Sequence, residues 1–96
     1  MFWNYNNPGV EELIESDIIE DLLHENRLVI HNDDYNTFDY VIYVLMKVLN
    51  HTEEQAEQCA LIAHYKGKCA VKEGSFDDLK IYRDAINEHG IKATIE

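Results

Sequence analysis

The polar run Asn32-Asp33-Asp34 gathers one amide and two carboxylates within three consecutive residues. Such residues favour turns because their side chains bond the nearby backbone, and acids just before a helix are favoured by its dipole. An amide and two carboxylates on one turn also suit a cation with several hydrogen-bond donors, such as an ammonium group. The run therefore predicts a turn, either with a structural role alone or with a bound ammonium group.

A second candidate group is His64, in the run His64-Tyr65-Lys66-Gly67-Lys68 at the end of a predicted helix. A histidine in this place commonly interacts with the negative end of its helix, which is the structural interpretation. That helix is joined to the preceding one by only His51 and Thr52, so the two helices are expected to run antiparallel. This arrangement brings His64 toward the Asn32–Asp34 turn, where both can contact one ligand.

A metal site is the chemical alternative, because imidazole and carboxylate groups that can ligate a metal occur at His31, Asp33, Asp34 and His64. Alternation along a strand sends His31 and Asn32 to opposite faces, which weakens this set. The sequence contains no HExxH motif, no paired CxxC motif and no short Cys/His spacing. Cys59 and Cys69 lie on the apolar face of a helix and at the start of a strand, which favours buried thiols. We therefore predict no metal and no cofactor.

The elements that position these groups are read from apolar spacing and helix caps. The apolar run 28–30 favours a buried strand, and the next helix is predicted from Thr37 to about residues 50–51. A second helix follows at once, because Thr52 and Gln55 have the spacing of a capping box. Gly67 is its predicted C-cap.

The second half of the chain predicts a strand at 69–71, a helix from Ser75 to Gly90, and a final strand at 91–95. The resulting order is strand, helix, helix, strand, helix, strand. Three amphipathic helices can cover one face of a three-stranded sheet. The predicted fold class is therefore α+β, a small two-layer sandwich in which a three-stranded antiparallel sheet packs against three helices (β-α-α-β-α-β).

Charge divides the chain of 96 residues, whose net charge is −11, into two parts. Residues 1–26 contain seven acids and no Lys or Arg, and the apolar spacing at 10–24 is that of an amphipathic helix. Residues 27–96 contain twelve acids and eight bases. We therefore predict an acidic N-terminal extension at 1–26 and one core domain at 27–96. A chain without a basic stripe is not expected to bind nucleic acid.

The location of the protein is predicted from segments that are missing from its sequence. No apolar run approaches the roughly 18 residues of a membrane helix. The first residues lack the basic and apolar regions of a secretory signal, and two cysteines make no disulfide framework. These features favour a cytoplasmic protein without a membrane segment, which we expect to be a monomer.

Taken together, several motifs resemble those of the ClpS family, the adaptors of Clp AAA+ proteases that read N-degrons. The motifs are Val29-Ile30-His31-Asn32-Asp33-Asp34-Tyr35, Glu54-Gln55-Ala56, His64-Tyr65-Lys66-Gly67-Lys68 and the C-terminal run 87–96. The resemblance covers roughly residues 27–96 and implies a small α/β domain of the kind described above. It also implies a non-enzymatic adaptor for proteins whose first residue is Leu, Phe, Tyr or Trp. Such an adaptor delivers them to a ClpA- or ClpC-type unfoldase for degradation by ClpP.

The same resemblance implies a role for each group of the site. The free α-amino group of the bound protein is expected to contact Asn32, Asp34 and His64, and Asp33 is assigned to the same α-amine set. The cavity for its first side chain is expected to be shaped by Ile30, Asn36, Phe38, Val41, Ala60, Ala63 and Ile91. The acidic segment 1–26 matches the variable N-terminal extension of the family, which assists transfer to the ATPase.

Three departures from the family pattern bear on specificity and docking. Phe38 stands where many members have a Met that excludes β-branched residues. Ala60 and Ala63 stand where bulkier apolar residues are usual. The segment 69–78 is shorter by about two residues, near the surface that docks on the ATPase, so the docking residues are left open.

Two other classes of function remain open at the level of sequence. The first is a small metal-dependent or acid–base hydrolase built on Asp33, Asp34 and His64. The second is an interaction domain in which the histidine and the turn are purely structural. Bound metal or turnover would indicate the first, and binding that ignores a free α-amine would indicate the second.

Overall fold

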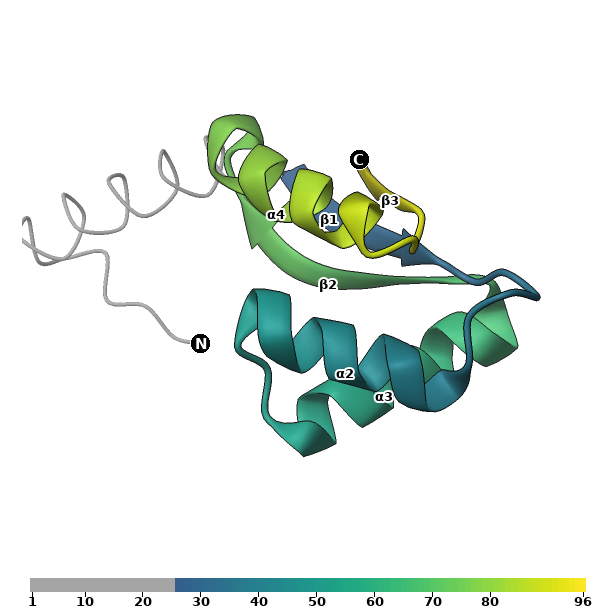
Figure 1. Ribbon diagram of the computed structural model, residues 1–96. Coiled ribbons are helices and arrows are strands. Elements are labelled where there is room, and N and C mark those ends of the chain that lie inside the picture. Colours follow the sequence, from purple (N-terminus) through teal and green to yellow (C-terminus); the bar gives the residue numbers. More distant parts are fainter. Residues whose placement is uncertain (1–25) are drawn as a thin grey trace, which may run out of the picture.

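The computed structural model describes residues 26–96, which form a three-stranded sheet and three helices (Figure 1). The elements follow in the order β1 (Asn26–His31), α2 (Phe38–Leu49), α3 (Glu53–Lys66), β2 (Lys68–Gly74), α4 (Phe76–Glu88) and β3 (Ala93–Ile95). This order and the α+β class confirm the prediction. The helix expected at 10–24 lies outside the described residues, and the division at residue 26 stays a prediction.

The sheet has the order β2-β1-β3, and both pairings are antiparallel. The central strand β1 pairs Ile30 with Cys69 on one side and with Ala93 on the other. A bulge lies between Leu28 and Val29 in the pairing with β2. The central strand therefore ends at His31 with a neighbour on each side, which fixes where the following turn begins.

One core joins the sheet to all three helices. Leu28 and Ile30 of β1 point to the same face of the sheet, because side chains alternate along a strand. That face packs against the helices in a cluster that includes Leu28, Ile30, Val44, Leu45, Ala56, Ala63, Cys69, Val71, Leu79, Ile86, Ile91 and Ala93. Helices α2 and α3 lie side by side, and α4 lies along β3 (Figure 1).

The N-caps of α2 and α3 and the C-cap of α3 form at the predicted residues, whereas α4 ends at Glu88, short of the predicted Gly90. Thr37 accepts a hydrogen bond from the backbone N–H of Tyr40, which starts α2. Thr52 and Gln55 form the capping box of α3, and Gly67 ends that helix with φ 93°. The short polar residues therefore set the helix boundaries locally, as expected from N-cap and C-cap chemistry.

All three strands have boundaries that differ from the prediction. Strand β1 covers 26–31 where 28–30 was predicted, and β2 begins one residue earlier than predicted, at Lys68. Strand β2 extends to Gly74 because the residues after Val71 continue to pair with the start of β1 beyond the bulge. Strand β3 begins at Ala93, so the strand predicted from Ile91 is wrong at its start. Ile91 belongs to the turn after α4, where its N–H donates to the carbonyl of Ile86 (3.3 Å).

Across residues 26–96, no helix combines the length and the apolar character needed to span a membrane.

Candidate functional site

A cavity of about 280 Å³ lies where the turn after β1 meets the two antiparallel helices α2 and α3. Its walls are formed by Ile30, His31, Asn32, Asp33, Asp34, Asn36, Phe38, Val41, Ala60, Ala63, His64 and Ile91. These include all eleven residues selected from the sequence. Four separate segments of the chain therefore meet at one place.

Asp33 organises the turn that carries the polar wall. Its Oδ1 accepts hydrogen bonds from the backbone N–H groups of Tyr35 (2.9 Å) and Asn36 (2.7 Å). Its Oδ2 accepts a third from the side-chain amide of Asn36 (2.8 Å). The backbone N–H of Asn36 is the main group that lowers the pKa of Asp33 below the ordinary 3.8, because these bonds favour the charged carboxylate. The geometry thus assigns this carboxylate a structural role in the turn.

Three other polar side chains of the wall have no such partners within the part of the chain that the structure describes. Among residues 26–96, no hydrogen bond or ion pair engages the side chains of Asn32, Asp34 or His64. All three line the cavity. An amide oxygen, a carboxylate and an imidazole nitrogen are therefore available to accept hydrogen bonds from a ligand.

The backbone at the end of α3 brings His64 to the turn. The N–H of Asn32 donates to the carbonyl of Gly67 (2.8 Å), and the N–H of Gly67 donates to Ala63 (2.9 Å). Gly67 reaches this position in the left-handed region, which a residue without Cβ adopts freely. His64 lies one helical turn earlier, so the same bonds hold it beside the polar wall. The ring of Tyr65 lies edge-on to the His64 ring, with 5.1 Å between the two ring centroids.

The remaining wall of the cavity is apolar. Ile30 and Ile91 are 1% and 2% exposed, and Ala60 and Ala63 are each 4% exposed. Phe38 is 40% exposed, as expected for a residue at the margin of the cavity. The small alanine side chains leave space next to α3 that a bulkier residue would fill. The cavity therefore offers acceptors in one part of its wall and apolar surface in the rest.

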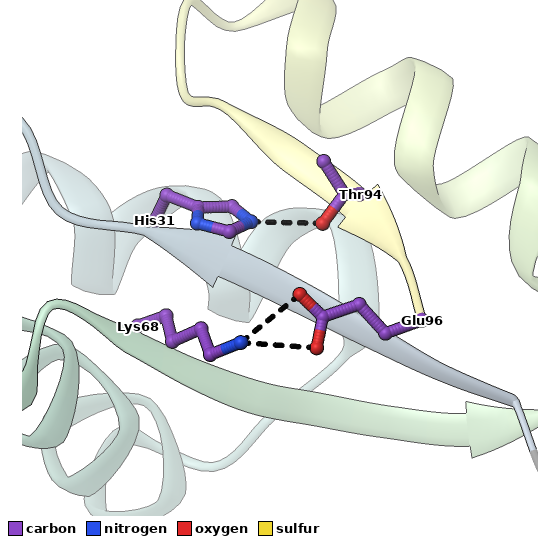
Figure 2. A network of polar contacts seen from close by, with 4 residues as sticks. All are labelled: His31, Lys68, Thr94 and Glu96. Atoms are coloured by element: carbon purple, nitrogen blue, oxygen red, sulfur yellow. Dashed lines mark hydrogen bonds and ion pairs between the residues drawn. The ribbon is translucent and has the colours of Figure 1, made fainter.

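His31 lines the cavity but was not assigned to it from the sequence, where it appeared only among the metal-ligand candidates. Its Nε2 lies 2.8 Å from Oγ1 of Thr94 on β3, as Figure 2 shows. In the same view, Nζ of Lys68 contacts both carboxylate oxygens of Glu96 at 3.2 Å (Figure 2). Strand alternation did not predict this position, because it sends the residue after the core-facing Ile30 to the other face of the sheet. His31 reaches the cavity wall because it is the last residue of β1.

The described residues do not assemble the metal site that was the chemical alternative. Within residues 26–96, no group of three or more His, Cys, Asp and Glu side chains lies close enough to hold one metal ion. Cys69 is buried as predicted, and Cys59 is half-buried. Burial raises the pKa of Cys69 to about 12 and also raises that of Cys59. Both thiols are therefore protonated at neutral pH, and neither lines the cavity.

Fold and cavity together define a small α+β domain whose cavity has hydrogen-bond acceptors in one part of its wall and apolar surface in the rest. Residues 24–94 match the family model of the ATP-dependent Clp protease adaptor protein ClpS. The chain therefore belongs to the ClpS family. Its general function is that of an adaptor for the Clp protease, as the family resemblance predicted.

Individual relatives support the same assignment. The Clp protease adapter protein ClpS of Synechococcus elongatus is 32% identical over 71 residues, which cover 73% of this chain and 75% of that protein. ClpS of Shewanella piezotolerans is 29% identical over 97 residues, which cover 95% of this chain and 93% of that protein. The solved structure of Agrobacterium tumefaciens ClpS2, bound to L-phenylalaninamide, matches with a TM-score of 0.64 at 26% identity. That match covers 74% of this chain and 93% of the solved one.

Proposed function

We propose that this adaptor binds proteins through their first residue, with separate parts of one cavity for the free α-amine and for the side chain. The observation that carries this proposal is the composition of the cavity wall. Three polar side chains without partners among the described residues line the same cavity of about 280 Å³ as Ile30, Ala60 and Ile91. The first residue of a protein has the matching chemistry, a cationic amine next to a side chain.

The polar wall suits a charged amine because an ammonium group that leaves water needs several acceptors. Asp34 supplies a carboxylate, Asn32 an amide oxygen and His64 an imidazole nitrogen. Asp33, placed in the same set by the sequence, acts by holding the turn, since three hydrogen bonds already occupy its carboxylate. An acetylated N-terminus carries no charge and cannot make these contacts.

The apolar wall suits the side chain of a first residue that is Leu, Phe, Tyr or Trp. Burying such a side chain contributes about 1.5–3 kcal/mol of hydrophobic free energy. The related ClpS2 structure supports this assignment, because L-phenylalaninamide has a free α-amine and a Phe side chain. Ile30, Asn36, Phe38, Val41, Ala60, Ala63 and Ile91 form this part of the proposed site.

Delivery to the protease completes the proposed function. In this proposal the core domain, residues 27–96, binds the substrate without catalysis and docks as a monomer on a ClpA- or ClpC-type unfoldase that works with ClpP. The acidic extension at 1–26 assists the transfer. Membership of an adaptor family for the Clp protease supports this step. In this proposal the protein acts in the cytoplasm.

Binding of a Phe-starting peptide beside its N-acetylated twin tests the proposal. The full chain should bind the free peptide and lose measurable affinity for the acetylated one, because only the first carries the ammonium group. Equal affinity for the two peptides would indicate an interaction domain that ignores the amine. Hydrolysis of the peptide would indicate an enzyme.

A further inference from the structure

The segment that carries Ile91 into the cavity follows a sharp turn at the end of α4. The N–H groups of His89 and Gly90 donate back to carbonyls of the last helical turn, and Gly90 has φ 86°. The N–H of Ile91 donates to Ile86 (3.3 Å). These bonds use the donors of the turn and leave the carbonyls of His89 and Gly90 pointing out of the helix, where they need other partners.

Two side chains, one from α2 and one from the turn before it, supply those partners. The hydroxyl of Tyr40, on α2, donates to the carbonyl of His89 (2.7 Å). The side-chain amide of Asn36, in the turn before α2, donates to the carbonyl of Gly90 (3.0 Å). The same amide also donates to Asp33 (2.8 Å), so both of its hydrogens are engaged and its orientation is fixed. A continuous set of hydrogen bonds therefore runs from the polar turn to the end of α4.

We propose that Tyr40 is a positioning residue of the site: together with Asn36 it ties α2 to the end of α4 and so fixes where Ile91 stands in the cavity wall. Tyr40 does not line the cavity and so acts through Ile91. The inference rests on the proposed function, because it concerns the wall that would contact the first side chain.

The physical consequence is a preorganised wall. Ile91 is 2% exposed and belongs both to the core and to the cavity lining. A wall held from two sides needs no ordering when the ligand binds, and preorganisation of this kind raises affinity. Loss of the hydroxyl leaves the His89 carbonyl without its side-chain partner, so the turn opens more often and the ligand must order it again.

Tyr40→Phe tests this inference because it removes the hydroxyl and keeps the ring. Tyr43→Phe is the matched control, since it removes a hydroxyl of the same helix whose one hydrogen bond within residues 26–96 comes from the exposed Lys47. In Tyr40→Phe, hydrogen exchange of the Gly90 and Ile91 amides should become about two- to tenfold faster, the range expected for one lost hydrogen bond. The Leu79 amide, at the other end of α4, should keep its rate.

Peptide binding supplies the second measurement. Tyr40→Phe should weaken binding of Leu- and Phe-starting peptides about two- to tenfold, while Tyr43→Phe binds as the wild type does. In an Ile91→Val background, the same Tyr40 substitution should have a smaller effect, because residues that act through one another are not additive. A purely structural role for Tyr40 would give additive effects.

The outcomes separate this inference from the proposed function. Wild-type exchange rates at Gly90 and Ile91 in Tyr40→Phe would overturn it, and so would additive effects of the Tyr40 and Ile91 substitutions. A wild-type protein that binds free and acetylated peptides equally would instead refute the proposed function. The exchange measurement needs no ligand and still decides whether the hydroxyl holds the turn.

Discussion

At the scale of single residues, the two neighbouring aspartates show how similar side chains take different roles. Asp33 directs its carboxylate back to the turn, whereas the side chain of Asp34 has no hydrogen bond among the described residues. The difference arises because the turn presents the N–H groups of Tyr35 and Asn36 to Asp33. One acid therefore builds the site, and the other is available to a ligand.

The first prediction concerns the groups that are available to the ligand. Asp34→Ala or His64→Ala should each weaken binding of a Leu- or Phe-starting peptide by about 1.5–3 kcal/mol, the range for a hydrogen bond to a charged group. The free energy of unfolding should change little, because both residues are exposed. Titration calorimetry measures the first quantity and thermal unfolding the second. Wild-type affinity in both variants would remove these residues from the amine site.

The second prediction concerns Phe38 at the margin of the cavity. Ile and Val are branched at Cβ and stiff at χ1, so as first residues they should meet the Phe38 ring and bind more weakly than Leu. Phe38→Ala should admit Ile and Val and weaken binding of Leu, because the emptied space loses contacts. A peptide series that differs only in its first residue measures both effects. Equal wild-type affinity for Ile and Leu would rule out the steric role.

At the scale of elements, the turn between β1 and α2 is supported by an ionised carboxylate. The hydrogen bond from the Asn36 backbone lowers the pKa of Asp33 in the folded protein. A carboxyl group with a lowered folded pKa stabilises the fold above its unfolded pKa, and this contribution is lost as the pH falls through the folded value.

The third prediction follows from this linkage. Asp33→Ala should be less stable than the wild type by a constant amount above about pH 5, where the unfolded carboxyl group is ionised. The difference should shrink as the pH falls below about 4. Chemical denaturation of both proteins from pH 7 to pH 3 measures it. A difference that does not depend on pH would show that the charge of Asp33 does not support the turn.

At the scale of the whole molecule, one backbone hydrogen bond joins the sheet to the helical layer beside the cavity. Asn32 and Gly67 are 35 residues apart in the sequence, yet the N–H of one bonds the carbonyl of the other (2.8 Å). Gly67 can take part because its φ of 93° is open to a residue without Cβ. The end of α3 and the end of β1 are thereby held together.

The fourth prediction tests this junction with Gly67→Ala. An added Cβ meets no atom within 4 Å, so the cost comes from the backbone alone and should be about 1 kcal/mol. For a domain of this size, that cost lowers the melting temperature by about 4–8 °C. Gly74→Ala is the control, because Gly74 lies in a strand and its Cβ would make ordinary contact with Leu79 at 3.5 Å. Equal melting temperatures for the two variants would contradict the role of Gly67.

The sequence by itself determined the elements, their order and where each helix starts, because those depend on nearby residues. Thr37, Thr52 and Gly67 cap their helices through hydrogen bonds to residues a few positions away. The apolar spacing likewise selects helix or strand from neighbouring residues. The resemblance to a known family then placed eleven residues at one site, and the fold brings all of them to one cavity.

Only the tertiary structure decided how that cavity is supported. Whether Ile91 continues a strand depends on the turn after α4, and that turn is held by Tyr40 from a distant helix. The position of His31 in the wall likewise depends on where β1 ends between its neighbours. Such contacts join residues far apart in the chain, and no local pattern encodes their distance or direction.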